Sequence, residues 1–172
     1  MRQGTIIDRD HRTNTTKTIS TMKDIIEFRG KSEDSGKWIF GDLMVHQPFL
    51  EENFYIKSNK KGPITWEKIK PITIGQYTGF SIRGQKIYHG DIIKIREENE
   101  SGIDHIIYCV VVWVKEWGMF ATLLADEYSK YLESGVDELD DLLIWTYTLE
   151  DTDSIKHFIC GNIFDHKELL NK

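Results

Sequence analysis

Apolar residues recur along this chain in short runs of strand length rather than in helical stripes. The runs mix β-branched and aromatic side chains with polar ones, and Gly, Asn, Asp or Ser residues separate many of them. This pattern predicts a mostly β fold built as a meander of short strands. The expected strands cover residues 25–29, 37–45, 54–57, 64–69, 72–74, 91–96, 105–115, 117–124, 142–149 and 155–161.

The first two expected strands flank a turn-prone segment, residues 32–36, and should pair as a hairpin. In the second of them, Trp38 and Phe40 share one face, while Ile39, Leu43 and Val45 share the other. Further on, residues 75–80 and 86–95 alternate turn residues with β-formers, as two strands joined by a tight turn would.

Helix is expected only in two short places. Residues 125–133 place Tyr128, Tyr131 and Leu132 on one side and end near a Ser-Gly pair. Residues 164–170 suit one or two closing turns. We expect the core to be formed by residues that lie centrally in the strongest β runs. These residues are Trp113, Val111, Ile93, Ile95, Phe120 and Ile159.

Composition supports an ordinary globular protein. With 172 residues and 40% hydrophobic residues, the chain can bury a real core in one domain or two very small ones. Cys109 and Cys160 each lie in an apolar run, where we expect small buried hydrophobes and no disulfide. The longest apolar stretch, residues 106–114, is too short to span a membrane, so we expect a cytoplasmic protein without a membrane partner.

The net charge of −6 disfavours a protein that coats nucleic acid through bulk electrostatics. The charge is uneven, because residues 1–23 carry five basic and two acidic residues, which makes that segment net +3 and the rest −9. Residues 1–21 are polar and aperiodic. We interpret them as a flexible N-terminal arm or an extension, with a functional basic arm as the alternative.

A second basic cluster offers a candidate surface for a ligand or nucleic acid. Lysines interleaved with aromatic rings can contact phosphates and bases together, although a solvated loop explains the same residues. The candidate residues are Lys57, Lys60, Lys61, Trp66, Lys68 and Lys70.

No segment carries a recognisable reaction chemistry. The His and Cys residues lack zinc-site spacing, no phosphate-binding glycine loop occurs, and the acidic run 137–141 lacks the ligand spacing of a calcium loop. Asp91 follows Gly90 at a strand entrance, where an Asp commonly clamps a turn through nearby backbone N–H groups. The sequence therefore predicts no catalytic residue, no metal and no cofactor.

Five sequence blocks, taken in order, resemble those of the YopX family of phage and prophage proteins. The residues of these blocks are expected to be structural. The blocks are Phe28-Arg29; Trp38 with Gly41-Asp42-Leu43; Gln76-Tyr77-Thr78-Gly79; Lys86 with Ile87-Tyr88-His89-Gly90-Asp91-Ile92; and Gly161-Asn162-Ile163-Phe164.

The resemblance implies a setting rather than a mechanism. It implies an N-terminal β region over residues 22–80, an SH3-like small barrel over residues 81–172, a phage or prophage gene and self-association. It implies no established activity. We therefore expect a non-enzymatic accessory protein in the host cytosol, acting by binding and self-assembly as a homo-oligomer. A host or phage protein is an alternative partner. A nucleic-acid or nucleotide-binding module is the less favoured alternative function, and an enzyme whose site is assembled only in space is the second alternative.

Overall fold

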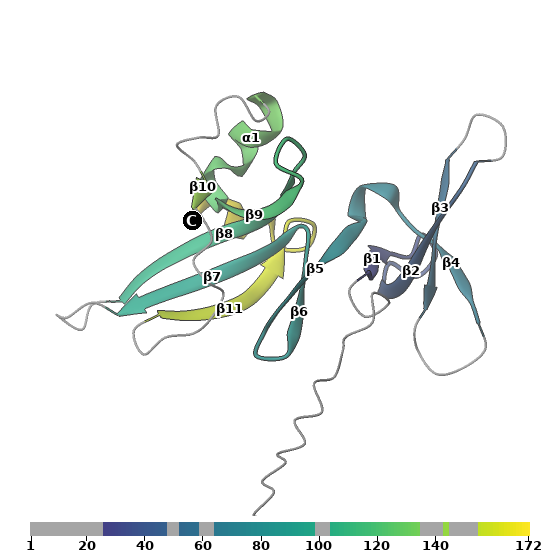
Figure 1. Ribbon diagram of the computed structural model, residues 1–172, viewed down its shortest axis with the longest axis horizontal. Coiled ribbons are helices and arrows are strands. Elements are labelled where there is room, and N and C mark those ends of the chain that lie inside the picture. The colour runs from purple at the N-terminus through teal and green to yellow at the C-terminus, as the bar shows by residue number, and fades with distance from the viewer. Residues whose placement is uncertain (1–25, 48–51, 59–63, 99–103, 135–142, 145–154) are drawn as a thin grey trace, which may run out of the picture.

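Two β lobes joined by a hairpin make up the protein (Figure 1). The computed structural model describes residues 26–47, 52–58, 64–98, 104–134, 143–144 and 155–172. Strands dominate these residues, so the predicted mostly β class is confirmed. The expected strands 142–149 and the acidic run 137–141 lie largely outside the described residues, as does the whole segment 1–21.

The N-terminal lobe is a six-stranded sheet in the order β4-β3-β2-β1-β5-β6. Its strands are β1 (Phe28–Lys31), β2 (Trp38–His46), β3 (Asn53–Ser58), β4 (Trp66–Lys68), β5 (Gly75–Ile82) and β6 (Gln85–Tyr88). The predicted hairpin is confirmed, because β1 pairs antiparallel with β2 and sets Arg29 opposite Phe40.

The C-terminal lobe is a five-stranded sheet in the order β10-β9-β8-β7-β11, with every neighbouring pair antiparallel. Its strands are β7 (Asp91–Glu98), β8 (Asp104–Val114), β9 (Met119–Leu124), β10 (Leu143–Ile144) and β11 (Ile155–Asn162). Most of these bounds lie within a few residues of the expected ones.

Within the described parts of the chain, helical structure is confined to short pieces. A 3-10 turn at Ala125–Glu127 leads into α1 (Tyr128–Ser134), and another 3-10 turn, Lys167–Asn171, closes the chain, as the sequence predicted. The strand expected at residues 72–74 is wrong, because Pro71–Thr73 forms a 3-10 turn. Pro71 fixes its own φ in the helical range, and the Thr73 hydroxyl ties the turn to β1 by accepting the Lys31 N–H.

Two apolar clusters cover the two faces of the C-terminal sheet. On one face, Ile92 and alternate valines of β8 pack against Tyr128 and the closing turn. On the other face, Ile93 and Val111 pack against Ile82 and Ile87 of the β5–β6 hairpin. Both faces are buried because alternate residues of β7 and β8 point to opposite sides.

The expected core is correct at most positions and wrong at one. Val111, Ile93 and Ile95 are buried, and Phe120 and Ile159 pack partly buried against the same cluster. Trp113, in contrast, is 42% exposed. It continues the apolar face of β8 beyond the part that the β5–β6 hairpin covers, and strand periodicity alone does not show where that cover ends.

β5 belongs to both lobes. Its start pairs with β1, setting Gln76 opposite Phe28, and its end delivers Ile82 to the C-terminal core. The expected boundary after residue 80 falls inside this strand. No ladder among the described residues joins the hairpin to the five-stranded sheet, so the SH3-like barrel and the two-region division stay predictions.

Candidate functional site

Residues of the five sequence blocks meet at the joint between the two lobes, where a buried ion pair links the lobes. Arg29 of β1 places Nη1 2.5 Å from Oδ1 of Asp91, at the start of β7, and their side chains are only 8% and 3% exposed. Arg29 Nη2 also donates to the carbonyl of His89 at 3.2 Å. One guanidinium therefore ties the N-terminal sheet to the turn that opens the C-terminal sheet.

Asp91 also holds its own turn. Its Oδ2 accepts the Tyr88 backbone N–H at 2.8 Å, the geometry of a turn clamp, while Gly90 supplies a φ of 82°. Burial raises the pKa of Asp91 above its ordinary value, although Arg29 and the Tyr88 N–H favour the charged form. Sequence reasoning found the clamp but missed Arg29, because the two residues lie far apart in the chain.

Aromatic rings enclose the Arg29 guanidinium. Its centre lies 4.8 Å from the ring of Trp38 and 5.0 Å from the ring of Tyr88, so cation–π attraction adds to the ion pair. The Tyr88 hydroxyl donates to Glu27, which also pairs with Lys86 at 2.8 Å. Burial and the Glu27 carboxylate raise the pKa of Tyr88, so its hydroxyl stays protonated.

A second polar link joins the lobes through Asp165, just beyond β11. Its carboxylate accepts from Lys31, from Trp38 Nε1 at 2.9 Å and from Asn162 Nδ2 at 3.2 Å. These donors, with Lys31 the largest influence, lower the pKa of Asp165 to about 2. Asn162 builds the turn by accepting the Phe164 and Asp165 N–H groups, each at 3.0 Å.

The remaining block residues pack or turn the chain beside this joint. The Thr78 hydroxyl donates to the Ile87 carbonyl at 3.1 Å, and Gly79 has a φ of 89°. The rings of Tyr77 and Tyr88 lie 5.7 Å apart. A Cβ at Gly161 would lie 2.6 Å from the His166 ring, so that position has room only for glycine.

The described residues contain no group of three or more His, Cys, Asp or Glu side chains placed to hold a metal ion. Burial raises the pKa of Cys109 to about 12, which keeps its thiol protonated and poorly nucleophilic. Among the same residues, no helix is long and apolar enough to cross a membrane.

The lysine cluster is only partly brought together. Lys57 stands opposite Trp66, and Lys68 opposite Tyr55, on the β3–β4 ladder. Lys68 pairs with Glu33 at 3.2 Å, and Lys70 is exposed next to the Pro71 turn. Lys60 and Lys61 lie outside the described residues.

Lys57, Trp66, Tyr55 and Lys68 belong to a surface that we call the outer face of the N-terminal sheet. The ladders set Asp42, Lys57 and Trp66 in one row and Met44, Tyr55 and Lys68 in the next. Strand alternation puts Phe40 on the same side of β2 as Asp42 and Met44, at the border with the joint, where its ring meets the ring of Tyr88 at 5.6 Å. The outer face consists of Phe40, Asp42, Met44, Tyr55, Lys57, Trp66 and Lys68, of which Phe40, Met44 and Trp66 are exposed large hydrophobic residues.

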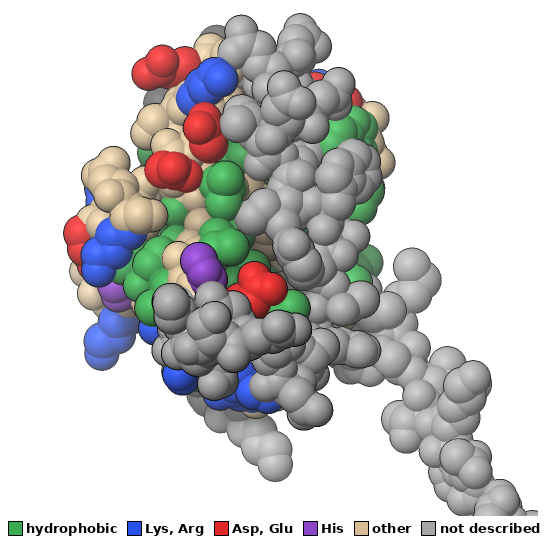
Figure 2. Space-filling model, turned by 90° about the vertical axis from the view of Figure 1, so that its left-hand side faces the viewer, with side chains coloured by type: hydrophobic (Ala, Val, Ile, Leu, Met, Phe, Trp, Pro, Cys, Tyr) green, Lys and Arg blue, Asp and Glu red, His purple; other side chains and the backbone are tan. Residues whose placement is uncertain are grey.

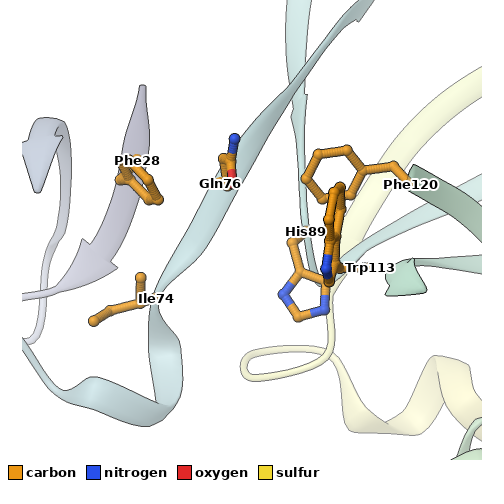
Figure 3. A pocket seen from close by; sticks show the side chains of 6 residues that line it. All are labelled: Phe28, Ile74, Gln76, His89, Trp113 and Phe120. Atoms are coloured by element: carbon orange, nitrogen blue, oxygen red, sulfur yellow. The ribbon is translucent and has the colours of Figure 1, made fainter. Parts of the chain in front are cut away.

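A hollow of about 230 Å³ lies between the lobes. Figure 3 shows Phe28, Ile74 and Gln76 on the side of the N-terminal sheet, facing His89, Trp113 and Phe120 across the space. Sequence reasoning missed this site because its six residues come from four strands and two connections, and no motif marks them as a group.

The end of the C-terminal lobe presents a different surface. In Figure 2, hydrophobic side chains gather near the middle of this face, and charged side chains lie over α1 at the top. Exposed apolar residues of this lobe include Ile106 and Leu132.

No curated protein and no solved structure matches the chain. A family model does match it. The family model described as YopX protein matches residues 27–171, which is most of the chain and includes all five blocks around the joint. The chain therefore belongs to the YopX protein family.

Proposed function

We propose that this chain is a non-enzymatic accessory protein of a phage or prophage, which acts by binding and self-associates through the outer face. The observation that carries the proposal is the exposure of Phe40, Met44 and Trp66 on one side of a single sheet. Exposed apolar groups that gather on one surface of a folded domain commonly mark an interaction site.

A second copy of the chain is the partner that fits this face best. Lysines and a carboxylate flank the same apolar strip, with Lys57 next to Asp42 in one row. A twofold axis through the strip would let Lys57 of one copy approach Asp42 of the other while the apolar side chains are buried. Such self-complementarity is what an isologous dimer needs.

We place this activity in the cytosol of the host cell. Cys109 and Cys160 are both free thiols, which suits a reducing compartment. The phage or prophage setting is carried by the resemblance of the five blocks, and it is part of the proposal.

The self-association is tested by light scattering after size-exclusion chromatography, over a range of protein concentrations. We expect a dimer or larger assembly for the wild type and a monomer for Trp66→Glu and Met44→Glu, because each places a charge in the apolar strip. Leu132→Glu is the matched control, since Leu132 is exposed on α1, away from the outer face. A wild type that stays monomeric at every concentration refutes the proposal.

Nucleic-acid binding through the basic cluster is the second candidate, and the exposed Trp66 beside Lys57 favours it. The Lys68–Glu33 pair and the neighbouring Asp42 weaken the positive field, which makes this candidate the less favoured one. Titration of short oligonucleotides at two salt concentrations tests it, because each phosphate contact adds close to one unit to the slope of log affinity against log salt.

The comparison variant in that titration replaces Lys57, Lys60 and Lys61 by Glu. Loss of binding in this variant supports the cluster, whereas binding that is lost only in a chain starting at Met22 moves the site to the N-terminal segment. No binding by the wild type at low salt removes the candidate.

A further inference from the structure

The hollow between the lobes exists because an apolar sheet face is left partly uncovered. Cys109 and Val111 of β8 are buried beneath the β5–β6 hairpin, but Trp113, next on the same face, is exposed. Trp113 stands opposite Phe120 of β9, and their rings meet edge to face at 4.9 Å. The rings of Trp113 and Phe120 therefore form one wall of the hollow, at the part of the sheet face that the β5–β6 hairpin does not cover.

Two neutral polar side chains share the hollow with these rings. Gln76 and His89 come from segments that are held together, because the His89 backbone N–H donates to the Gln76 carbonyl at 2.9 Å. The His89 carbonyl in turn accepts from Arg29. Burial and the nearby Arg29 lower the pKa of His89, so the ring is a neutral imidazole with one donor and one acceptor.

The chemistry of the lining residues indicates which class of ligand the hollow can bind. None of the six lining side chains carries a charge at neutral pH, so the lining offers a charged group no ion-pair partner. The Gln76 amide and the His89 imidazole each offer both a donor and an acceptor, which matches the mixed edge of a nucleobase rather than a purely apolar ring. The volume of about 230 Å³ exceeds the roughly 150 Å³ of a cavity that holds benzene, so one or two fused rings fit.

We infer that this hollow binds a flat, uncharged nitrogen heterocycle of the nucleobase class. Trp113 and Phe120 contact the ring, and Gln76 and His89 hydrogen-bond to its edge (Figure 3). The site is separate from the outer face, so it stands or falls independently of self-association. The heterocycle can belong to a free nucleoside or to an unpaired base of a single strand.

Calorimetric titration with adenosine, cytidine and uridine tests the site directly, with indole as a ring that has one N–H donor but lacks the mixed donor and acceptor edge. We expect at least one nucleoside to bind at millimolar concentration or below. Trp113→Ala should weaken that binding at least about fivefold, the loss expected when a base loses an aromatic stacking partner. Phe80→Ala is the matched control, because it removes an exposed aromatic ring that does not line the hollow and should leave the affinity unchanged.

Gln76→Leu separates the recognition of the ring edge from simple apolar packing. It should weaken nucleoside binding severalfold and indole binding less, because the nucleoside edge can use both the donor and the acceptor of the amide, whereas indole has a single N–H donor. A ten-nucleotide single strand that competes with the nucleoside, and that Trp113→Ala also weakens, identifies the source as single-stranded nucleic acid. Binding of the nucleoside without such competition identifies a small molecule.

Three results would overturn the inference. They are no binding by any nucleoside at millimolar concentration, indole binding as tight as that of the best nucleoside, and nucleoside binding that Trp113→Ala leaves unchanged in a variant with wild-type circular dichroism. The oligomeric state of the wild type, measured separately, decides the proposed function and does not enter this test.

Discussion

At the scale of single residues, the joint depends on charges that are buried in compensating pairs. Asp91→Asn keeps an oxygen for the Tyr88 N–H but removes the counter-charge of Arg29, whose side chain is only 8% exposed. Leaving a buried charge unpaired costs about 3–5 kcal/mol, so we expect a loss of that size in urea unfolding.

The double variant Arg29→Met with Asp91→Asn is the control for this prediction. It removes both charges, so it should be less destabilised than the sum of the two single variants. Wild-type stability in Asp91→Asn would show that the pair contributes nothing.

Asp165 provides a residue-scale prediction for pH. Its folded-state pKa of about 2 lies below the ordinary value of 3.8, so the ionised form is favoured by folding. Its contribution to stability is therefore present above about pH 4 and is lost as the pH falls from 4 to 2. The stability difference between wild type and Asp165→Asn should shrink over that window in urea unfolding. A difference that stays constant from pH 5 to pH 2 would contradict it.

At the scale of elements, β1 packs unusually closely on its neighbours. A Cβ added at Gly30 would lie 2.2 Å from Ile69 Cγ2 and 3.4 Å from Ile56 Cδ1. Gly30→Ala should therefore cost about 1–3 kcal/mol through overpacking. Ser35→Ala, in the exposed turn after β1, is the control and should change stability by no more than about 0.5 kcal/mol. Equal stability of the two variants would show that β1 can shift without cost.

The end of β8 gives a second prediction at this scale. Because Trp113 is 42% exposed, Trp113→Ala should cost less than the roughly 3–5 kcal/mol typical of a buried aromatic residue. Thermal unfolding measures this directly, with Val111→Ala as the buried comparison on the same face. A loss of about 3 kcal/mol or more for Trp113→Ala would show that Trp113 is buried in the core.

At the scale of the whole molecule, the shared strand and the ion pairs should make the two lobes unfold together. β5 pairs with β1 and also contributes Ile82 to the C-terminal core. If β5 detaches from one lobe on unfolding, the other lobe therefore loses part of its sheet or its core as well. Urea unfolding followed by circular dichroism and by tryptophan fluorescence should give coincident curves. Curves with separate midpoints would show that the lobes unfold independently.

The sequence by itself determined what depends on near neighbours. Alternation and turn residues located most strands, the β1–β2 hairpin, the short helix beginning at Tyr128 and the Asp91 clamp. These features are local, because strand periodicity and turn chemistry are written over a few adjacent residues. The five ordered blocks also sufficed to identify the family.

Only the tertiary structure decided how distant residues meet. Arg29 and Asp91 are far apart in the chain, and nothing in either segment specifies the other as its partner. The exposure of Trp113 depends on where the β5–β6 hairpin stops covering β8, which periodicity cannot reveal. The hollow has the same origin, because its walls come from two lobes whose relative placement is set by long-range packing and by the buried ion pair.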